Sequence, residues 1–188
     1  FDCKLIIDYG QKEMTYMEME KVFLEHVEKI YGKDNLEIVK KAFHFADKKH
    51  AGQKRDTGED YIIHPYACAK ILVELRADID SVVCGLLHDC IEDTNCEPEE
   101  ILKAFGETVY TICVGASKIE PIKHARRKHL EENENLRRMF LTLSKDARVA
   151  FVKLADRLHN MQTLDIKNRA DQLKIAKETL DIYVPLAE

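Results

Sequence analysis

Apolar residues recur along most of this chain with the spacing of helices. The apolar positions between residues 36 and 46 follow the helical period: Leu36, Val39, Ala42, Phe43 and Ala46. Such spacing is typical of an amphipathic helix with one buried face. Alternating strand patterns are scarce, and seven glycines and four prolines leave few breaks in the pattern. The sequence therefore predicts an all-α fold, a helical bundle.

Start and stop signals divide the chain into expected helices. Gly32 is a C-terminal stop, Asp34 is expected to cap the second helix with Glu37 in a capping box, and Pro65 suits a first helical turn. The intervening segment 53–65 is predicted as a loop. The expected helices cover 15–31, 34–51, 65–76, 80–94, 98–106, 107–118, 135–160 (with a possible break near Asp146) and 170–183. No repeat or linker divides residues 1–188, so we expect one domain.

Charged residues interrupt an apolar stretch near the middle of the chain. Seven of the ten residues from Val82 to Ile91 are apolar or cysteine, yet His88 and Asp89 lie near the end of this run. Burying an ionised carboxylate costs several kcal/mol unless it is paired or bound to a metal. A divalent cation would resolve this conflict and would also supply chemistry.

Composition narrows the classes of function. The net charge of −5 argues against non-specific nucleic-acid binding, so we expect no direct nucleic-acid partner. No apolar stretch is long enough to cross a membrane, and the first ten residues lack a secretory signal. Six scattered cysteines form no CxxC pair. We interpret them as reduced thiols in a cytoplasmic protein, with a zinc site or disulfides as the alternatives.

The apolar run continues into a group of acidic side chains. Residues three or four apart share a helix face, so His88 is expected above Glu92, and Asp89 near Glu92 and Asp93. Imidazole and carboxylate together suit a divalent first-row ion that keeps open water positions. Glu92 and Asp93, one turn later, are candidates for moving protons.

Two distant segments add residues of the same kind. His64 precedes Pro65 at a predicted helix entrance, where its ring can be held rigidly. In a later helix, Asp156, Asn160 and Thr163 share one face, at offsets of four and seven. A lone Asp in a helix is usually a solvated surface residue, so Asp156 gains significance only from the other motifs.

Five ordered motifs suggest a family. They are HAGQKRDTGEDYIIHP (50–65), LLHDCIEDT (86–94), NLRRMF (135–140), KLADRLHNMQTL (153–164) and ETLDIYVPLA (178–187). The order H…HD…D resembles the HD superfamily of metal-dependent phosphohydrolases. Taken together, the motifs resemble the hydrolase domain of RelA/SpoT-type alarmone enzymes, from about residue 40 to the end of the chain.

The resemblance implies a specific reaction. The family hydrolyses the stringent-response alarmone (p)ppGpp to GDP or GTP and pyrophosphate, with one metal ion, usually Mn²⁺. Carried over to this sequence, the metal ligands would be His64, His88, Asp89 and Asp156. Glu92 and Asp93 would be the catalytic acidic pair, and Arg55, Asn160 and Thr163 would contact the substrate. The implied fold is an HD-domain helical bundle with a single buried metal site.

The motif around residue 184 resembles the junction at which long family members continue into a synthetase domain. We therefore expect residues 1–188 to be one hydrolase domain from a longer chain with synthetase and regulatory domains. Departures from the family pattern at Asp56, Asp60, Val114, Ala116 and Gln162 affect expected substrate contacts rather than the reaction.

Less specific interpretations remain beside these. His88 could be an ordinary core histidine, Glu92 and Asp93 an exposed helix end, and Asn160 a capping residue. The other six histidines, including His50 and His159, are expected at the surface. The basic cluster 123–129 is a solvated face or a contact for the 5′ phosphates. Alternative functions are an HD-family phosphohydrolase of another nucleotide and a non-catalytic nucleotide-binding regulatory module.

Overall fold

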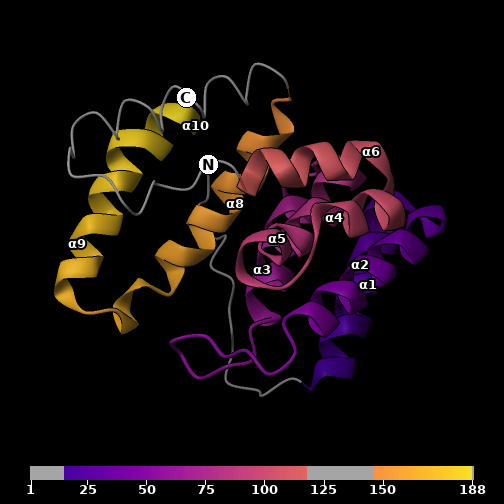
Figure 1. Ribbon diagram of the computed structural model, residues 1–188, viewed down its shortest axis with the longest axis horizontal. Helices are drawn as coiled ribbons and strands as arrows, with labels where there is room; N and C mark the ends of the chain where they lie inside the picture. Colours follow the sequence, from indigo (N-terminus) through magenta and orange to yellow (C-terminus); the bar gives the residue numbers. More distant parts are fainter. Residues whose placement is uncertain (1–14, 118–145, 188) are drawn as a thin grey trace.

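The computed structural model describes residues 15–117 and 146–187 (Figure 1). Throughout these ranges the ordered elements are helices, and the one strand-like feature is an isolated antiparallel bridge between Lys54 and Asp60. The prediction of an all-α bundle is therefore confirmed. The basic cluster 123–129 and the NLRRMF motif lie outside the described residues, so their predicted roles are not tested.

The first two helices follow the sequence signals only in part. Helix α1 (Tyr16–Tyr31) begins at a capping box between Thr15 and Glu18, and it ends at Gly32, which has a φ of 78°. This left-handed conformation favours glycine. The prediction that Asp34 caps the next helix is wrong. Asp34 lies in a 3-10 turn, η1 (Lys33–Asn35), and α2 (Leu36–Lys49) follows without a side-chain cap.

The centre of the molecule is the antiparallel pair α3 (Ile63–Glu74) and α4 (Ile79–Leu87). Every residue from Ser81 to Leu87 is buried. The two helices approach closely at Gly85, where an added Cβ would lie 2.6 Å from Leu72 Cδ1 and 3.2 Å from Ala69 Cα. Helices α2, α6 and α8 pack around this pair, so α4 is enclosed on all sides.

The single helix predicted over 80–94 is interrupted at the histidine and aspartate of the central motif. Helix α4 ends at Leu87, His88 and Asp89 form a turn, and α5 (Cys90–Asp93) follows. The backbone dihedral angles of both turn residues stay in the right-handed helical region. The interruption is therefore mild, and Asp93 N–H still donates to Asp89 O at 2.9 Å.

Helix α6 (Pro98–Ser117) contains a kink at Gly106, whose φ is 86°, which agrees with the predicted end of one helix and start of another. Helix α8 (Arg148–Gln162) leads through η2 (Leu164–Ile166) to α9 (Arg169–Glu178). A short π-helix, η3 (Thr179–Tyr183), and α10 (Val184–Ala187) complete the described chain. None of the described helices is both long and apolar enough to cross a membrane.

Candidate metal centre and pocket

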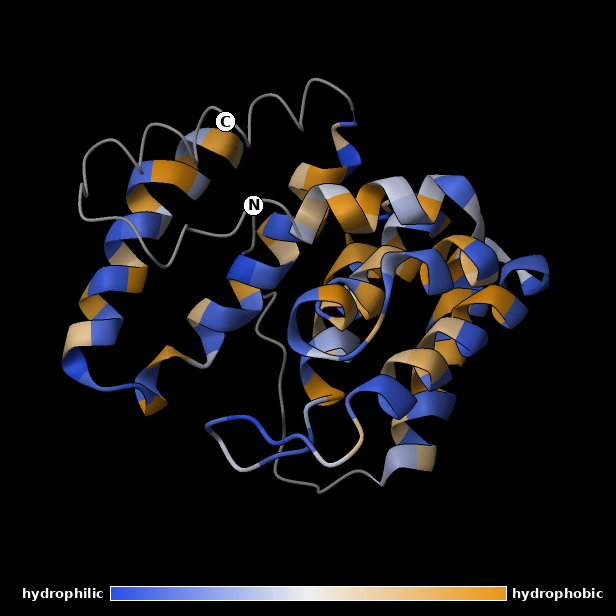
Figure 2. Ribbon diagram, in the orientation of Figure 1, coloured by the Kyte–Doolittle hydropathy of each residue, from blue (hydrophilic) through white to orange (hydrophobic). Residues whose placement is uncertain are grey.

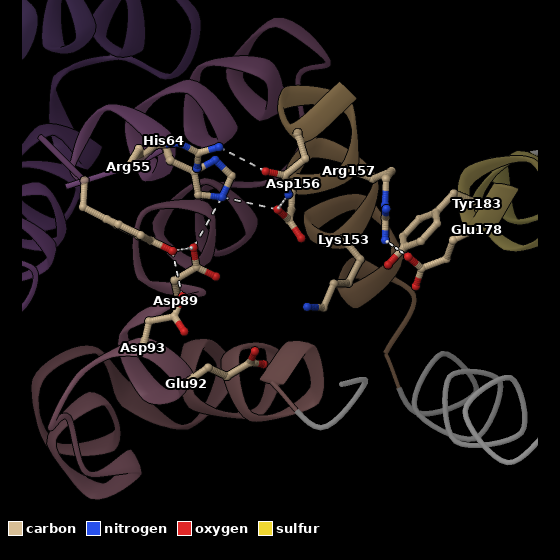
Figure 3. A pocket seen from close by; sticks show the side chains of 12 residues that line it. Arg55, His64, Asp89, Glu92, Asp93, Lys153, Asp156, Arg157, Glu178 and Tyr183 are labelled. Carbon is tan, nitrogen blue, oxygen red and sulfur yellow. Dashed lines mark hydrogen bonds and ion pairs between the residues drawn. The ribbon is translucent and has the colours of Figure 1, made fainter. Parts of the chain in front are cut away.

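The predicted site residues meet around one pocket of about 280 Å³. The pocket opens between the 53–62 loop, the α4–α5 turn and helix α8 (Figure 3). It is strongly polar. The lining residues are Arg55, Tyr61, His64, Asp89, Glu92, Asp93, Lys153, Asp156, Arg157, Asn160, Glu178 and Tyr183. Four segments of the sequence, within residues 55–64, 89–93, 153–160 and 178–183, thus supply one site.

His64 lies at the base of this pocket, in the first turn of α3, and is only 2% exposed. Its Nε2 is 3.3 Å from both Asp89 Oδ2 and Asp156 Oδ1. Burial lowers the pKa of His64, but the Cys68 sulfur and the two carboxylates raise it, and the net pKa is well above the usual value. The carboxylates of Asp89 and Asp156 thus favour the protonated form of the His64 ring.

His88 has a geometry that fits a metal ligand. Its Nδ1 donates to the carbonyl oxygen of Gly85 at 2.8 Å, because a carbonyl can only accept. In the neutral ring, Nε2 therefore carries a lone pair. This atom is buried and has no hydrogen-bond partner among the described residues, although Asp89 Oδ1 lies 3.1 Å away and Asp156 Oδ1 3.9 Å away. A lone pair that faces carboxylate oxygens is satisfied when a cation lies between them.

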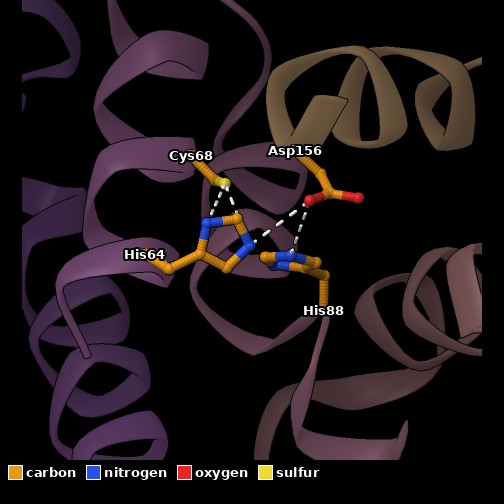
Figure 4. A group of neighbouring side chains, drawn as sticks. All are labelled: His64, Cys68, His88 and Asp156. Atoms are coloured by element: carbon orange, nitrogen blue, oxygen red, sulfur yellow. Dashed lines mark hydrogen bonds and ion pairs between the residues drawn. The ribbon is translucent and has the colours of Figure 1, made fainter. Parts of the chain in front are cut away.

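The four predicted ligands are therefore brought together. One ligand atom from each of His64, His88, Asp156 and the neighbouring Cys68 lies within 4.8 Å of the others (Figure 4). Asp89 contacts both histidine rings. Burial tends to raise the pKa of Asp89, but the two histidines lower it overall. The pKa of Asp156 is likewise lowered, mainly by the His64 hydrogen bond acting against burial.

The acidic pair lies beside this cluster. Asp93 Oδ2 is 2.7 Å from the hydroxyl of Tyr61, and the same hydroxyl is 3.0 Å from Asp89 Oδ2. Burial and both carboxylates raise the pKa of Tyr61, so the hydroxyl keeps its proton and donates it. Tyr61 thus fixes the spacing between a predicted ligand and a predicted catalytic acid. Glu92 lines the same pocket.

The predicted substrate residues form a connected group. Arg55 Nη2 donates to Asn160 Oδ1 at 3.2 Å and to Thr163 Oγ1 at 3.4 Å. Asn160 Nδ2 in turn donates to Asp156 Oδ1 at 2.6 Å. Arg55 and Asn160 line the pocket, whereas Thr163 acts on it through Arg55. Arg55 is therefore connected by hydrogen bonds through Asn160 to Asp156, one of the predicted metal ligands.

Two pocket cations were not singled out from the sequence. On α8, Lys153 lies three residues before Asp156 and Arg157 one residue after it, and both line the pocket (Figure 3). Burial lowers the pKa of Lys153, but the Asp156 and Glu92 carboxylates raise it overall, so the ammonium stays charged. Arg157 lies over the Tyr183 ring at 4.1 Å and pairs with Glu178 at 3.0 Å. The three-residue spacing from Asp156 was an available signal for Lys153, whereas Arg157, next to Asp156 in the sequence, had no such signal.

The expectation that His50 and His159 lie at the surface was wrong, because each is only 2% exposed. His50 stacks on Tyr61 with ring centroids 4.4 Å apart. His159 Nδ1 lies 2.7 Å from His64 Nδ1. Cys68 is also adjacent, with Sγ 3.7 Å from His64 Nδ1. A single histidine within a polar segment gives no periodic pattern in the sequence. Only the tertiary structure therefore shows that His50 and His159 are buried beside the site.

Asp56, a departure from the family pattern, forms an ion pair with Lys167 at 2.6 Å. Asp56 is the residue after Arg55 in the 53–62 loop, and Lys167 is the residue after η2. The contact therefore joins this loop to the end of η2. It lowers the pKa of Asp56, mainly through the hydrogen bond from the ammonium group. The acidic residue thus has a partner within the domain.

Comparisons with known proteins agree with this geometry. The HD domain family model matches residues 42–188. A solved structure described as a metazoan ortholog of SpoT that hydrolyzes ppGpp superposes with a TM-score of 0.59 and 26% identity. That match covers 77% of this chain and 84% of the other.

Curated relatives match at higher identity. A GTP pyrophosphokinase of Myxococcus xanthus is 46% identical over 81% of this chain, which covers 20% of that relative. A guanosine-3′,5′-bis(diphosphate) 3′-pyrophosphohydrolase of Borreliella burgdorferi is 42% identical over 89% of this chain and 25% of that relative. A protein of the same name from Aquifex aeolicus is 45% identical over 80% of this chain and 21% of that relative.

The chain therefore spans a quarter or less of the length of these curated relatives. The family match covers most of the chain, and the described residues have the helical fold and the H…HD…D cluster that the motifs predict. The chain belongs to the HD domain family, and its similarity to the curated relatives and to the SpoT ortholog agrees with the resemblance of its motifs to RelA/SpoT-type enzymes.

Proposed function

We propose that this domain hydrolyses (p)ppGpp at its 3′ diphosphate and yields GDP or GTP and pyrophosphate. The observation that carries the proposal is the juxtaposition in one pocket of a histidine and aspartate cluster with the cations Arg55, Lys153 and Arg157. A polyanionic substrate needs positive side chains, and Arg also offers bidentate phosphate contacts. The names of the Borreliella and Aquifex relatives support the same reaction.

We propose that a divalent cation, Mn²⁺ in particular, is held by His64, His88, Asp89 and Asp156. The mixed imidazole and carboxylate set suits such an ion, and the unpartnered lone pair of His88 supports this assignment. When bound, the ion would lower the pKa of a coordinated water and neutralise negative charge on the diphosphate.

The acidic pair would handle protons. Glu92 lines the pocket near the cluster and would accept a proton from the attacking water or return one to the departing 3′ oxygen. Asp93, held by the Tyr61 hydroxyl at 2.7 Å, would position the water. The Glu92 carboxylate helps to keep the Lys153 ammonium charged beside the pocket.

Substrate binding is assigned to Arg55, Asn160 and Thr163. The hydrogen bonds to Asn160 and Thr163 hold the Arg55 guanidinium group at the pocket wall. A preorganised guanidinium loses less conformational entropy when it binds a phosphate or stacks on the purine.

We further propose that the domain works in the cytoplasm within a longer chain, beside synthetase and regulatory domains. The relatives are four to five times longer than the matched part, and one of them is named a GTP pyrophosphokinase. The five described cysteines are free and buried, which is consistent with a reducing compartment.

The deciding experiment is turnover of ppGpp by the purified chain with added Mn²⁺, with and without a chelator, with nucleotide and pyrophosphate as the measured products. Chelator-sensitive release of GDP and pyrophosphate is the expected result. A folded protein that binds Mn²⁺ but turns over only a different nucleotide would favour another HD phosphohydrolase. Nucleotide binding without turnover of any nucleotide would favour a regulatory module.

A further inference from the structure

His159 is a buried histidine that the proposed chemistry does not use. It lies on α8, three residues after Asp156, and 2% of its surface is exposed. Its ring is 4.9 Å from that of His64 between centroids, and the two Nδ1 atoms are 2.7 Å apart. This distance corresponds to a short hydrogen bond between two imidazoles.

Two imidazole nitrogens that form one hydrogen bond share one proton, so one donates and the other accepts. The Nε2 atom of His64 faces the carboxylates of Asp89 and Asp156, where the cation would bind. A ligating Nε2 must offer a lone pair, and the ring proton of His64 is then on Nδ1. His64 Nδ1 therefore donates, and His159 Nδ1 accepts.

His88 provides an internal comparison. Its Nδ1 donates to the Gly85 carbonyl oxygen, which leaves Nε2 directed at the same carboxylates. Both histidines thus have the δ nitrogen engaged by an acceptor and the ε nitrogen directed into the cluster. For His88 the acceptor belongs to the backbone, whereas for His64 it belongs to a side chain that mutation can remove.

Cys68 does not explain the orientation of His64 equally well. Its Sγ lies 3.7 Å from Nδ1 and 3.9 Å from Nε2 of the ring, so it favours neither nitrogen. Sulfur is also a weak acceptor. Cys68 packs against the ring, and His159 supplies the directional contact.

We propose that His159 is a positioning residue, which fixes the tautomer and ring orientation of His64 and thereby completes the cation site. Helix α8 then contributes twice to the site, through Asp156 directly and through His159 by way of His64. Partners of this kind typically change metal affinity or activity by about 10–100-fold when they are removed. The inference rests on the proposed cation site and not on the identity of the nucleotide.

The test compares two substitutions of similar size. His159→Leu fills the space but has no acceptor, whereas His159→Asn places an amide oxygen near the position of Nδ1. Calorimetry without nucleotide would measure Mn²⁺ affinity, and absorption spectra with Co²⁺ would report ligand geometry. We expect His159→Leu to weaken Mn²⁺ binding by about 10–100-fold and to change the Co²⁺ spectrum. His159→Asn should stay close to wild type in both.

The exposed His44 provides a control: it contacts Glu20, neither residue lines the pocket, and His44→Leu should change neither reading. The proposal is overturned if folded His159→Leu binds Mn²⁺ like wild type, or if Asn and Leu weaken it equally. If His159→Leu lacks a cooperative thermal transition, His159→Ala replaces it with the same expectation. A wild-type chain that binds no Mn²⁺ would overturn the cation site together with this inference, whereas loss of ppGpp turnover alone would leave both intact.

Discussion

Helices α4 and α8 both supply the candidate site, but they are buried to very different extents. In α4 every residue from Ser81 to Leu87 is buried. In α8 the buried residues are Val149, Val152, Ala155 and His159, and the other positions are partly or fully exposed. Figure 2 shows the same contrast, with apolar colours prevailing over the central helices and polar and apolar colours mixed along α8 and α9.

The difference separates two tasks. The enclosed helix α4 holds His88 and Asp89 rigidly at its end, but its own side chains pack in the core and do not reach the pocket. A helix with one open face can direct Asp156, Lys153 and Asn160 into a pocket while its other face packs on α3 and α4. Changes in α4 should therefore affect stability, and changes on the open face of α8 should affect chemistry.

The largest effect is expected from Asp156→Asn on α8. The substitution keeps the shape but removes a charge from the cluster, so Mn²⁺ binding and turnover should fall together, with turnover reduced on the order of 10³-fold. Calorimetry and a ppGpp assay measure the two quantities. Thermal melting without metal should fall only by the pairing with His64 that is lost, and a loss as large as that of a core substitution would contradict the separation of tasks.

Glu92→Gln should retain the metal and lose most of the rate. The amide cannot accept a proton, so we expect turnover to fall by about 10²–10³-fold. Mn²⁺ affinity measured by calorimetry serves as the control and should stay near wild type. A variant with a near-normal rate would remove Glu92 from the mechanism.

Gly85→Ala should have the opposite profile on α4. The new Cβ would lie 2.6 Å from Leu72 Cδ1 and within 3.3 Å of the Ala69 backbone. Overpacking of this kind costs about 1–3 kcal/mol, and the melting temperature should fall by about 2–12 °C. Leu158→Ala, at a 48% exposed position on α8, is the matched control and should stay within about 0.5 kcal/mol. Equal losses for the two variants would contradict the comparison.

Arg55→Ala should act on substrate binding. Arg55 bridges the 53–62 loop to Asn160 and Thr163, so its loss should raise KM about tenfold, or about 1.4 kcal/mol, with a smaller change in kcat. Steady-state kinetics over a range of ppGpp concentrations separates the two constants. An unchanged KM would refute a role for Arg55 in binding.

The smallest effect is expected at the start of α4. Asp78 Oδ1 accepts from the backbone N–H groups of Asp80 and Ser81 at 3.1 and 3.2 Å. Asp78→Ala should cost about 1 kcal/mol at pH 7. Burial tends to raise the pKa of Asp78, but hydrogen bonds from Ser81 and the charge of Arg148 bring it below the usual value.

The ionised cap therefore stabilises the fold above about pH 4, the pKa of an unfolded aspartate, and this contribution is lost as the pH falls through the lower folded pKa. Urea titrations of wild type and Asp78→Ala should show a gap that is full at pH 7 and narrows below about pH 4. A gap independent of pH would assign the effect to the helix backbone instead.

Much of the architecture could be predicted because local patterns determine it. The period of Leu36, Val39 and Phe43 identifies a buried helix face, and Gly32 and Gly106 mark helix ends where a positive φ is required. Asp34 was misjudged as a cap because a 3-10 turn satisfies that end of α2. At this position the sequence is compatible with a side-chain cap and with a 3-10 turn, and the folded structure has the turn.

The sequence by itself determined the helical class, the order of the motifs and the residue types of a cation and phosphate site. Only the tertiary structure decided which groups converge: His159 on His64, Tyr61 between Asp89 and Asp93, and Lys153 in the pocket. The physical reason is that periodicity records which face of a helix is buried, whereas a contact between helices depends on how those faces pack. The hydrogen bonds among them join residues 28 to 95 positions apart and leave no local pattern.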